Sequence, residues 1–116
     1  MPLIKVQTSA PCDRHLKEVT VKELSALTAA GIGKPESYMA AILEDDGVIS
    51  FGGELGPAAL VEVRSIGGLG GDVNGRLSAA ITDCLQRRLG VDPGRIYINF
   101  VEVSASDWAW KGAPFG

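Results

Sequence analysis

The sequence predicts an α+β fold in which two β–α–β units form a four-stranded mixed sheet with both helices on one face. Two stretches, residues 13–30 and 77–89, carry apolar residues at helical spacing, and strand-like runs flank both. Each helical stretch ends in glycine, and a proline-containing link then leads to a strand that carries a tyrosine. This repeated pattern predicts two units that pair into one sheet.

Length and composition fit one folded domain. A chain of 116 residues can bury a single core, and an apolar content of 46% argues against disorder. We therefore expect one domain over residues 1–116, with pseudo-repeats over about 2–51 and 58–103 and a C-terminal tail over 104–116.

The first unit is expected to contain a strand, a helix, a second strand and a short hairpin strand. In chain order these are Pro2–Gln7, Asp13–Ala30, Ser37–Leu43 and Val48–Phe51. The helix places its apolar residues on one face, and Gly31 and Gly33 are expected to close it.

The second unit repeats this order. Ala58–Ile66 reads as a central strand with apolar residues on both faces, and a glycine-rich loop leads to Asn74 as a helix N-cap. The helix ends at Gly90, and Arg95–Val103 is the clearest strand in the chain. Two helices cover only one sheet face, so the apolar residues on the other face predict a symmetric oligomer.

Charge and cysteine content exclude several classes of function. The formal charge is −3, and Arg87–Arg88 is the only adjacent basic pair, so no nucleic-acid or membrane-surface patch is expected. No run is long enough to span a membrane and no signal peptide is visible, which makes the cytoplasm the default location. Export without a signal peptide would leave no trace in the sequence. Cys12, Cys84 and the single His15 predict neither a metal site nor a disulfide framework, and no cofactor is expected.

The chemistry is expected at Pro2. A small residue at position 2 permits removal of Met1, which would give Pro2 a free secondary amine at the end of a strand. Burial or a nearby cation lowers the pKa of such an amine toward neutrality, where a base works best. The competing interpretation is that proline after methionine merely protects the amino terminus.

Further candidate site residues lie in the helix end, the last strand and the tail, and some of them also have a purely structural interpretation. Lys34 follows a helix end, where a cation is favoured anyway, but the topology also puts it near Pro2. Tyr97 and Asn99 share one face of a strand and can bind a carboxylate or enolate oxygen. The aromatic residues of the tail either cover a pocket or cap the core; they are Trp108, Trp110 and Phe115.

Two other motifs are rejected as sites. The glycine-rich run Gly70–Leu77 has arginine where a phosphate-binding loop needs lysine, and leucine where it needs serine or threonine. Cys84 falls on an apolar helix face and is assigned to the core, whereas Cys12 stands at a helix entrance.

The order of short motifs resembles that of a known family. These motifs are Met1-Pro2-Leu3, Gly33-Lys34-Pro35 with Tyr38, Phe51-Gly52-Gly53, Ser65-Ile66-Gly67 with Gly70-Gly71, and Arg95 to Phe100. They resemble the macrophage migration inhibitory factor (MIF) family of the tautomerase superfamily, including D-dopachrome tautomerase, from Pro2 to Phe115. The resemblance implies the MIF-like fold and a homotrimer with active sites between subunits.

The same resemblance implies an isomerase that needs no cofactor and interconverts the keto and enol forms of phenylpyruvate-like α-keto acids and dopachrome-type compounds. Pro2 would be the general acid and base. Lys34 and the Ile66 backbone would bind the substrate, and Tyr97 and Asn99 would reach in from a neighbouring subunit. The remaining substrate-binding positions implied are Tyr38, Ser65, Trp108, Trp110 and Phe115.

The chain also departs from the family pattern. Ala58 to Val61 replaces a CxxC motif, so thiol–disulfide exchange is not expected. Cys12 replaces an arginine linked to receptor binding, although Asp46 keeps the acidic partner. Arg64 stands where the family has a histidine and Trp108 where it has a small aliphatic residue, which suggests a preference for smaller or more anionic substrates.

Three hypotheses for function therefore follow from the sequence. The leading one is a keto–enol tautomerase. The second is a MIF-like cytokine or signalling ligand with vestigial chemistry, a role that Cys12 weakens. The third is a ligand-binding trimer.

Overall fold

Alternation of buried and exposed residues builds the central pair of strands, β1 (Pro2–Thr8) and β3 (Ala59–Ser65). The computed structural model describes residues 1–116, and its strand order is β2–β1–β3–β4. The edge strands are β2 (Ala40–Glu44) and β4 (Ile96–Glu102). β1 runs parallel to β2 and antiparallel to β3, and β3 runs parallel to β4. The predicted α+β fold class is thereby confirmed.

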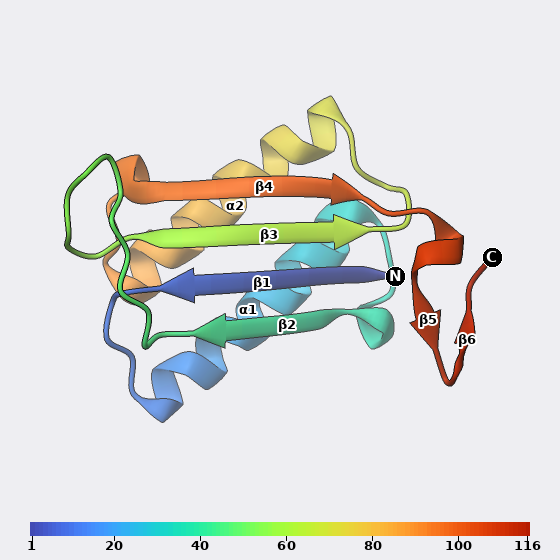
Figure 1. Ribbon diagram of the computed structural model, residues 1–116, viewed down its shortest axis with the longest axis horizontal. Coiled ribbons are helices and arrows are strands. Elements are labelled where there is room, and N and C mark those ends of the chain that lie inside the picture. Colours follow the sequence, from blue (N-terminus) through green and yellow to red (C-terminus); the bar gives the residue numbers. More distant parts are fainter.

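Two helices, α1 (Arg14–Ile32) and α2 (Gly71–Leu89), lie together on one face of this sheet (Figure 1). The Asp13 side chain caps α1 by accepting a hydrogen bond from the Leu16 amide at 2.8 Å. Gly33 and Gly90 close the helices with φ of 81° and 70°, a conformation that glycine adopts without steric cost.

The hydrophobic core fills the space between the helices and the sheet. Its largest members are fully buried and come from β1, β3 and both helices: Ile4, Val6, Leu24, Val63, Leu77, Ile81 and Leu85. Cys84 is part of the same cluster, as its position on the apolar helix face predicts. The core thus fixes β1, whose first residue is Pro2, at the centre of the sheet.

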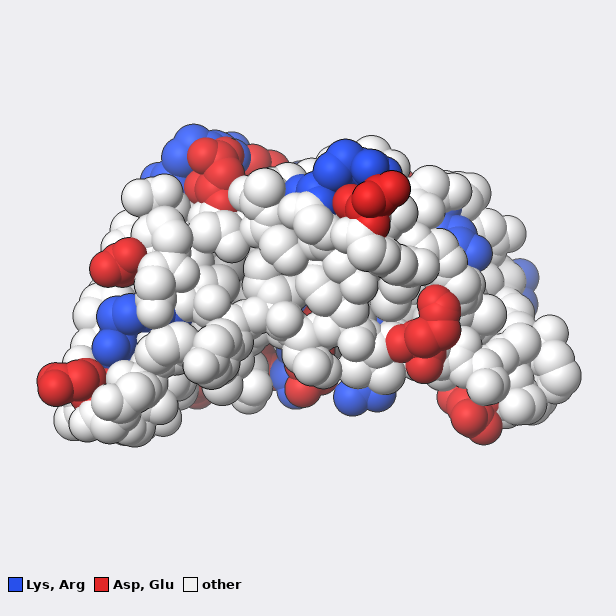
Figure 2. All heavy atoms as spheres, turned by 90° about the horizontal axis from the view of Figure 1, so that it is seen from above, with Lys and Arg blue, Asp and Glu red and all other residues white.

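The other sheet face has no helix over it, and it is not apolar. Along β3 the residues on this face are Leu60, Glu62 and Arg64, so the prediction of apolar residues on both faces of that strand is wrong. Figure 2 views the molecule edge-on, from above Figure 1, and shows positive and negative side chains scattered over this edge without a large patch of one sign. The uncovered face is therefore amphipathic, and only part of it calls for a partner surface.

Gly31 lies inside α1 instead of ending it. A Cβ placed there would come 2.5 Å from Leu77 Cδ2 of α2, so the glycine allows the two helices to approach closely. The sequence pattern of a helix cannot distinguish a glycine that lets another helix approach from a glycine that ends the helix.

Three other predicted boundaries are also wrong. Residues 36–38 form one 3-10 turn, η1 (Glu36–Tyr38), so the second strand begins later, at Ala40. Val48–Phe51 forms no strand, because only the isolated bridge between Phe51 and Glu54 exists there within the chain. Asn74 is not the N-cap: α2 begins at Gly71, and Asn74 accepts a hydrogen bond from the Gly70 amide at 3.2 Å.

The chain after β4 folds back beside the start of β1 (Figure 1). A 3-10 turn, η3 (Ala105–Asp107), precedes a small hairpin of β5 (Ala109–Trp110) and β6 (Ala113–Pro114). Its two-residue loop, Lys111–Gly112, has positive φ at both residues, 53° and 83°, as a type I′ turn requires. No helix of the protein has both the length and the apolar character needed to cross a membrane.

Candidate active site

Pro2 is the first residue of a central strand and lies at one end of the sheet. It pairs with Ser65 of β3, and its side chain is fully buried. A pocket of about 240 Å³ opens beside it, with no acidic side chain in its wall. The lining residues are Met1, Pro2, Ser37, Tyr38, Met39, Ala40, Trp108, Ala109, Trp110 and Phe115.

A short network connects Met1 to Lys34. The Ile66 amide donates a hydrogen bond to the Met1 carbonyl oxygen at 3.2 Å, and the Lys34 ammonium donates to the Ile66 carbonyl oxygen at 3.0 Å. Gly68, with φ of 82°, makes this approach feasible, since a Cβ there would stand 2.6 Å from Ile32 Cγ2 at the end of α1. Lys34 and Ile66, both predicted as site residues, are thus brought together next to the first residues of the chain.

The electrostatics at this point favour a neutral amine. The pKa of the Met1 amino group lies below its usual value of 8.0, first because of partial burial and second because of the Lys34 charge. Lys34 has no carboxylate partner within ion-pair distance. The site therefore combines a nitrogen of lowered basicity with an unneutralised cation.

Aromatic rings form the outer wall of the pocket. Trp110 meets Tyr38 edge-on, with ring centroids 5.8 Å apart, and is nearly parallel to Phe115 at 6.3 Å. Trp108 lines the same pocket and also a neighbouring hollow that contains Arg64. The tail aromatics thus surround a pocket, which decides between the two interpretations that the sequence left open.

Tyr97 and Asn99 do not reach this pocket. The sheet register places Tyr97 opposite Leu60, and Leu60 opposite Gln7, five residues along β1 from Pro2, or about 17 Å. Both side chains lie on the open sheet face, and Tyr97 is 68% exposed. Within one chain they are separate from the Pro2 site.

Arg95 organises the loop next to Tyr97. Its guanidinium donates to the carbonyl oxygens of Pro57 at 2.8 Å, Glu54 at 3.0 Å, Phe51 at 3.3 Å and Gly56 at 3.4 Å. The same loop packs the Phe51 ring against Tyr97, with centroids 4.6 Å apart. Sequence reasoning missed this role because the contacts span about forty residues and leave no local pattern.

Ser65 has a structural role, and the two cysteines have thiols of raised pKa. The buried Ser65 hydroxyl donates to the Gly67 carbonyl oxygen at 2.6 Å and so holds the turn that carries Ile66. Burial raises the pKa of the Cys84 thiol to about 11, and burial followed by the Asp45 charge raises that of Cys12. No group of three or more His, Cys, Asp or Glu side chains is placed to hold a metal ion.

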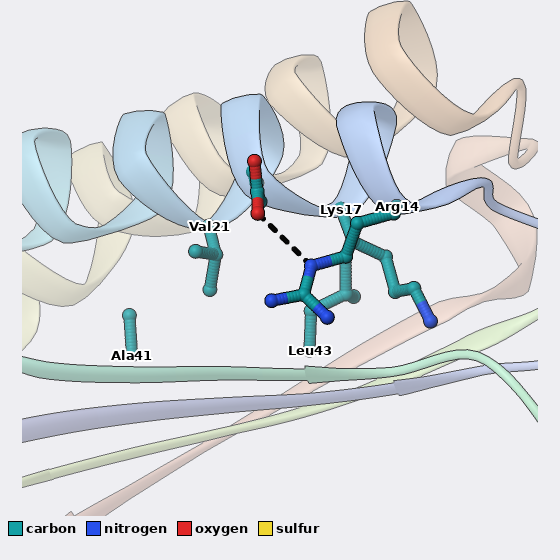
Figure 3. A pocket seen from close by; sticks show the side chains of 6 residues that line it. Arg14, Lys17, Val21, Ala41 and Leu43 are labelled. Carbon is teal, nitrogen blue, oxygen red and sulfur yellow. Dashed lines mark hydrogen bonds and ion pairs between the residues drawn. The ribbon is translucent and has the colours of Figure 1, made fainter.

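A second hollow, of about 320 Å³, lies between α1 and the edge strand β2 (Figure 3). Its cations are already paired, Arg14 with Glu18 at 2.9 Å and Lys17 with Asp45 at 3.1 Å. No nucleophile or free base faces it. Chemistry is better supported at the smaller pocket beside Pro2.

The similarity of this chain to known proteins extends over nearly its whole length. The family model described as macrophage migration inhibitory factor matches residues 1–116, the whole chain. The chain belongs to this family. A homologue from Trichuris trichiura is 36% identical over 115 residues, covering 99% of this chain and all of the relative. The factor from Rattus norvegicus is 34% identical over the same length, covering 99% of each chain.

Solved structures of MIF-family proteins have the same fold. A MIF homologue from Prochlorococcus marinus superposes with a TM-score of 0.93 at 36% identity, covering 98% of this chain and 99% of that one. The protein from Toxoplasma gondii gives 0.93 at 30% identity, covering 97% and 99%. Membership of the MIF family places the chain in the tautomerase superfamily and supports isomerase activity in general terms.

Proposed function

We propose that this MIF-family protein is a keto–enol tautomerase that acts on phenylpyruvate-like α-keto acids through the amine of Pro2 after removal of Met1. The observation that carries the proposal is the position of Pro2, buried at the start of a central strand and lining an aromatic pocket. Burial and then the Lys34 charge lower the pKa of the Met1 amino group, and after removal of Met1 the same charge would favour the neutral Pro2 amine and attract a carboxylate.

The reaction needs only one proton relay. The neutral Pro2 nitrogen takes a proton from the carbon next to the keto group, and the C–H electrons form the new C=C bond. The carbonyl π electrons move onto oxygen, which Lys34 stabilises as an enolate. The Pro2 ammonium then returns the proton to that oxygen, so atoms and charge balance without a cofactor.

The Ile66 amide is a further binding group. It donates to the Met1 carbonyl oxygen when Met1 is present. Removal of Met1 would release this donor for the substrate at the same time as it exposes the Pro2 amine. The single processing step would thus create both the base and a hydrogen-bond donor beside it.

We further propose a homotrimer in which Tyr97 and Asn99 of one subunit complete the pocket of the next. Support comes from their exposed position far from their own Pro2 and from the partly apolar open sheet face. Membership of the family is consistent with oligomeric assembly.

The decisive experiment is a phenylpyruvate tautomerase assay on protein whose intact mass shows that Met1 is absent. Pro2→Gly is expected to lower kcat/KM by about 10²–10⁴-fold while leaving assembly unchanged. As a matched control, an alanine inserted between Met1 and Pro2 turns the Pro2 nitrogen into an amide and should be equally inactive. Activity in either variant close to that of the parent would refute the Pro2 mechanism.

A signalling role is a second proposal, motivated by 34–36% identity to relatives named as migration inhibitory factors or their homologues. Receptor binding that survives Pro2→Gly would support a function independent of the chemistry. The family resemblance implies an arginine linked to receptor binding at the position of Cys12, so we expect such binding to be weak.

A further inference from the structure

Lys111 occupies an unusual place at the edge of the Pro2 pocket. It is the only non-glycine residue with positive φ, at 53°, in a two-residue hairpin loop where asparagine or glycine is favoured. Backbone strain of this kind concentrates at functional positions. The turn itself gives no reason for a lysine there.

The Lys111 ammonium lies against a ring of the pocket wall, although Lys111 itself is not one of the lining residues. Its ammonium lies 4.4 Å from the centroid of the Trp110 ring, and Trp110 lines the pocket. Lys111 makes no ion pair with any carboxylate of the chain, and no acidic residue lines the pocket. A positive charge without a carboxylate partner therefore lies beside the aromatic wall of the pocket.

A second cation without a carboxylate partner lies near the first residue of the chain. Lys34 is close enough to the first residue of the chain to lower the pKa of its amine, and it too lacks a carboxylate partner. The start of β1 and the β5–β6 hairpin lie next to each other at one end of the molecule (Figure 1). Two ammonium groups without a carboxylate partner thus lie next to residues that line one small pocket, Lys111 against Trp110 and Lys34 near Met1.

From this arrangement we propose that Lys111 is a specificity-determining residue, selecting α-keto acids that carry a second negative group at the end remote from the keto acid. Lys34 takes the α-carboxylate, the rings of Tyr38 and Trp110 hold the body of the substrate, and Lys111 receives the second carboxylate. This inference rests on the proposed tautomerase function, because it assigns a substrate class to the same site.

Arg64 is the other cation near the pocket. It lines a neighbouring hollow that shares Trp108 and Ala109 with the Pro2 pocket. Its guanidinium is 3.6 Å from a Glu62 carboxylate oxygen, so part of its charge is neutralised. The experiment must therefore separate Lys111 from Arg64.

The test compares phenylpyruvate with its para-carboxy derivative on protein lacking Met1. Lys111→Asn removes the charge and places a residue that the turn favours. It should lower the ratio of kcat/KM for the para-carboxy derivative (the diacid) to kcat/KM for phenylpyruvate (the monoacid) by about two- to fivefold. The loss should appear in KM, because the charge is remote from the reacting atoms. Lys111→Arg and the exposed control Lys22→Asn should leave the ratio unchanged. Salt near 1 M, where the Debye length is about 3 Å, should reduce the ratio of the parent protein.

Each result has one meaning. The inference is overturned, and the proposed function left intact, if active Lys111→Asn keeps the diacid-over-monoacid ratio of kcat/KM of the parent protein. The same holds if this ratio falls in Arg64→Gln but not in Lys111→Asn. If neither acid is turned over, the proposed function fails, and calorimetric binding of the two acids decides the inference. A subsite for the second carboxylate is supported if Lys111→Asn binds the diacid more weakly than the parent protein does but binds phenylpyruvate equally well. It is refuted if the two proteins bind the diacid equally well.

Discussion

Replacing Arg95 by alanine should loosen the loop over residues 51–57 and lower the stability of the whole protein. Two of the four bonds from Arg95 to carbonyl oxygens are well within hydrogen-bond range, at 2.8 and 3.0 Å, and two are longer, at 3.3 and 3.4 Å. If each short bond contributes about 1 kcal/mol and the long ones little, the free energy of unfolding should fall by about 2 kcal/mol. Arg95→Lys should recover only part of this, because an ammonium lacks the planar fork.

Urea unfolding at one fixed protein concentration measures the effect. With a slope of about 2 kcal/mol per molar, the midpoint should fall by about 1 M. Hydrogen exchange should locate the change, since the amides of Phe51 and Glu54 bond to each other's carbonyl oxygens at 2.9 and 3.1 Å and should lose protection.

Arg14→Ala is the matched control. Arg14 makes a single i,i+4 pair with Glu18 and is 86% exposed, so its loss should cost no more than about 0.5 kcal/mol. If Arg95→Ala and Arg14→Ala shift the midpoint equally, or if exchange at Phe51 and Glu54 is unaltered, Arg95 does not hold the loop and the argument from its bond geometry is wrong.

Two further predictions concern the contact between the helices. Gly31→Ala should destabilise the protein by about 1–3 kcal/mol, because the new Cβ would stand 2.5 Å from Leu77 Cδ2. Gly75→Ala on α2, with open space around it, should be neutral or stabilising by up to about 1 kcal/mol. Thermal unfolding of both variants measures the difference, and equal effects would contradict the prediction. The pKa of Glu23 lies below its ordinary value of 4.5, chiefly because Arg87 donates a hydrogen bond to it. A lowered carboxyl pKa stabilises the fold above pH 4.5 and ceases to do so as the pH falls below it, so the stability lost in Glu23→Gln should be largest near neutrality and shrink in acid; a difference independent of pH would disprove the pairing.

The fold could be predicted from the sequence where local patterns and tertiary packing agree. Both helices and the four sheet strands follow from periodicity and from glycine at the helix ends, as at Gly33 and Gly90. Gly31 was misassigned because its function is to admit Leu77, a residue of another helix. Val48–Phe51 has strand-like residues but no strand partner within its own chain, and composition cannot supply a partner.

The candidate site could be predicted only in part. Pro2 and the tail aromatics were predicted because they occupy distinctive positions, at the chain start and in a compact cluster. The expected topology put Lys34 near Pro2, and family resemblance supplied the role of Ile66. Lys111 and Arg95 were missed. Their roles depend on distances to Trp110 and to distant carbonyl oxygens, which no spacing rule encodes.

The amino-terminal and carboxy-terminal residues lie at the same end of the molecule (Figure 1), and both Met1 and Phe115 line the pocket. An affinity tag fused to the amino terminus converts the Pro2 nitrogen into an amide, and one fused to the carboxyl terminus begins within two residues of the aromatic wall. A fluorescent reporter is better attached to the outside of α1, for example through Lys22→Cys in a Cys12→Ser background, because Cys84 is fully buried and its thiol pKa is about 11. Such a label leaves both termini native.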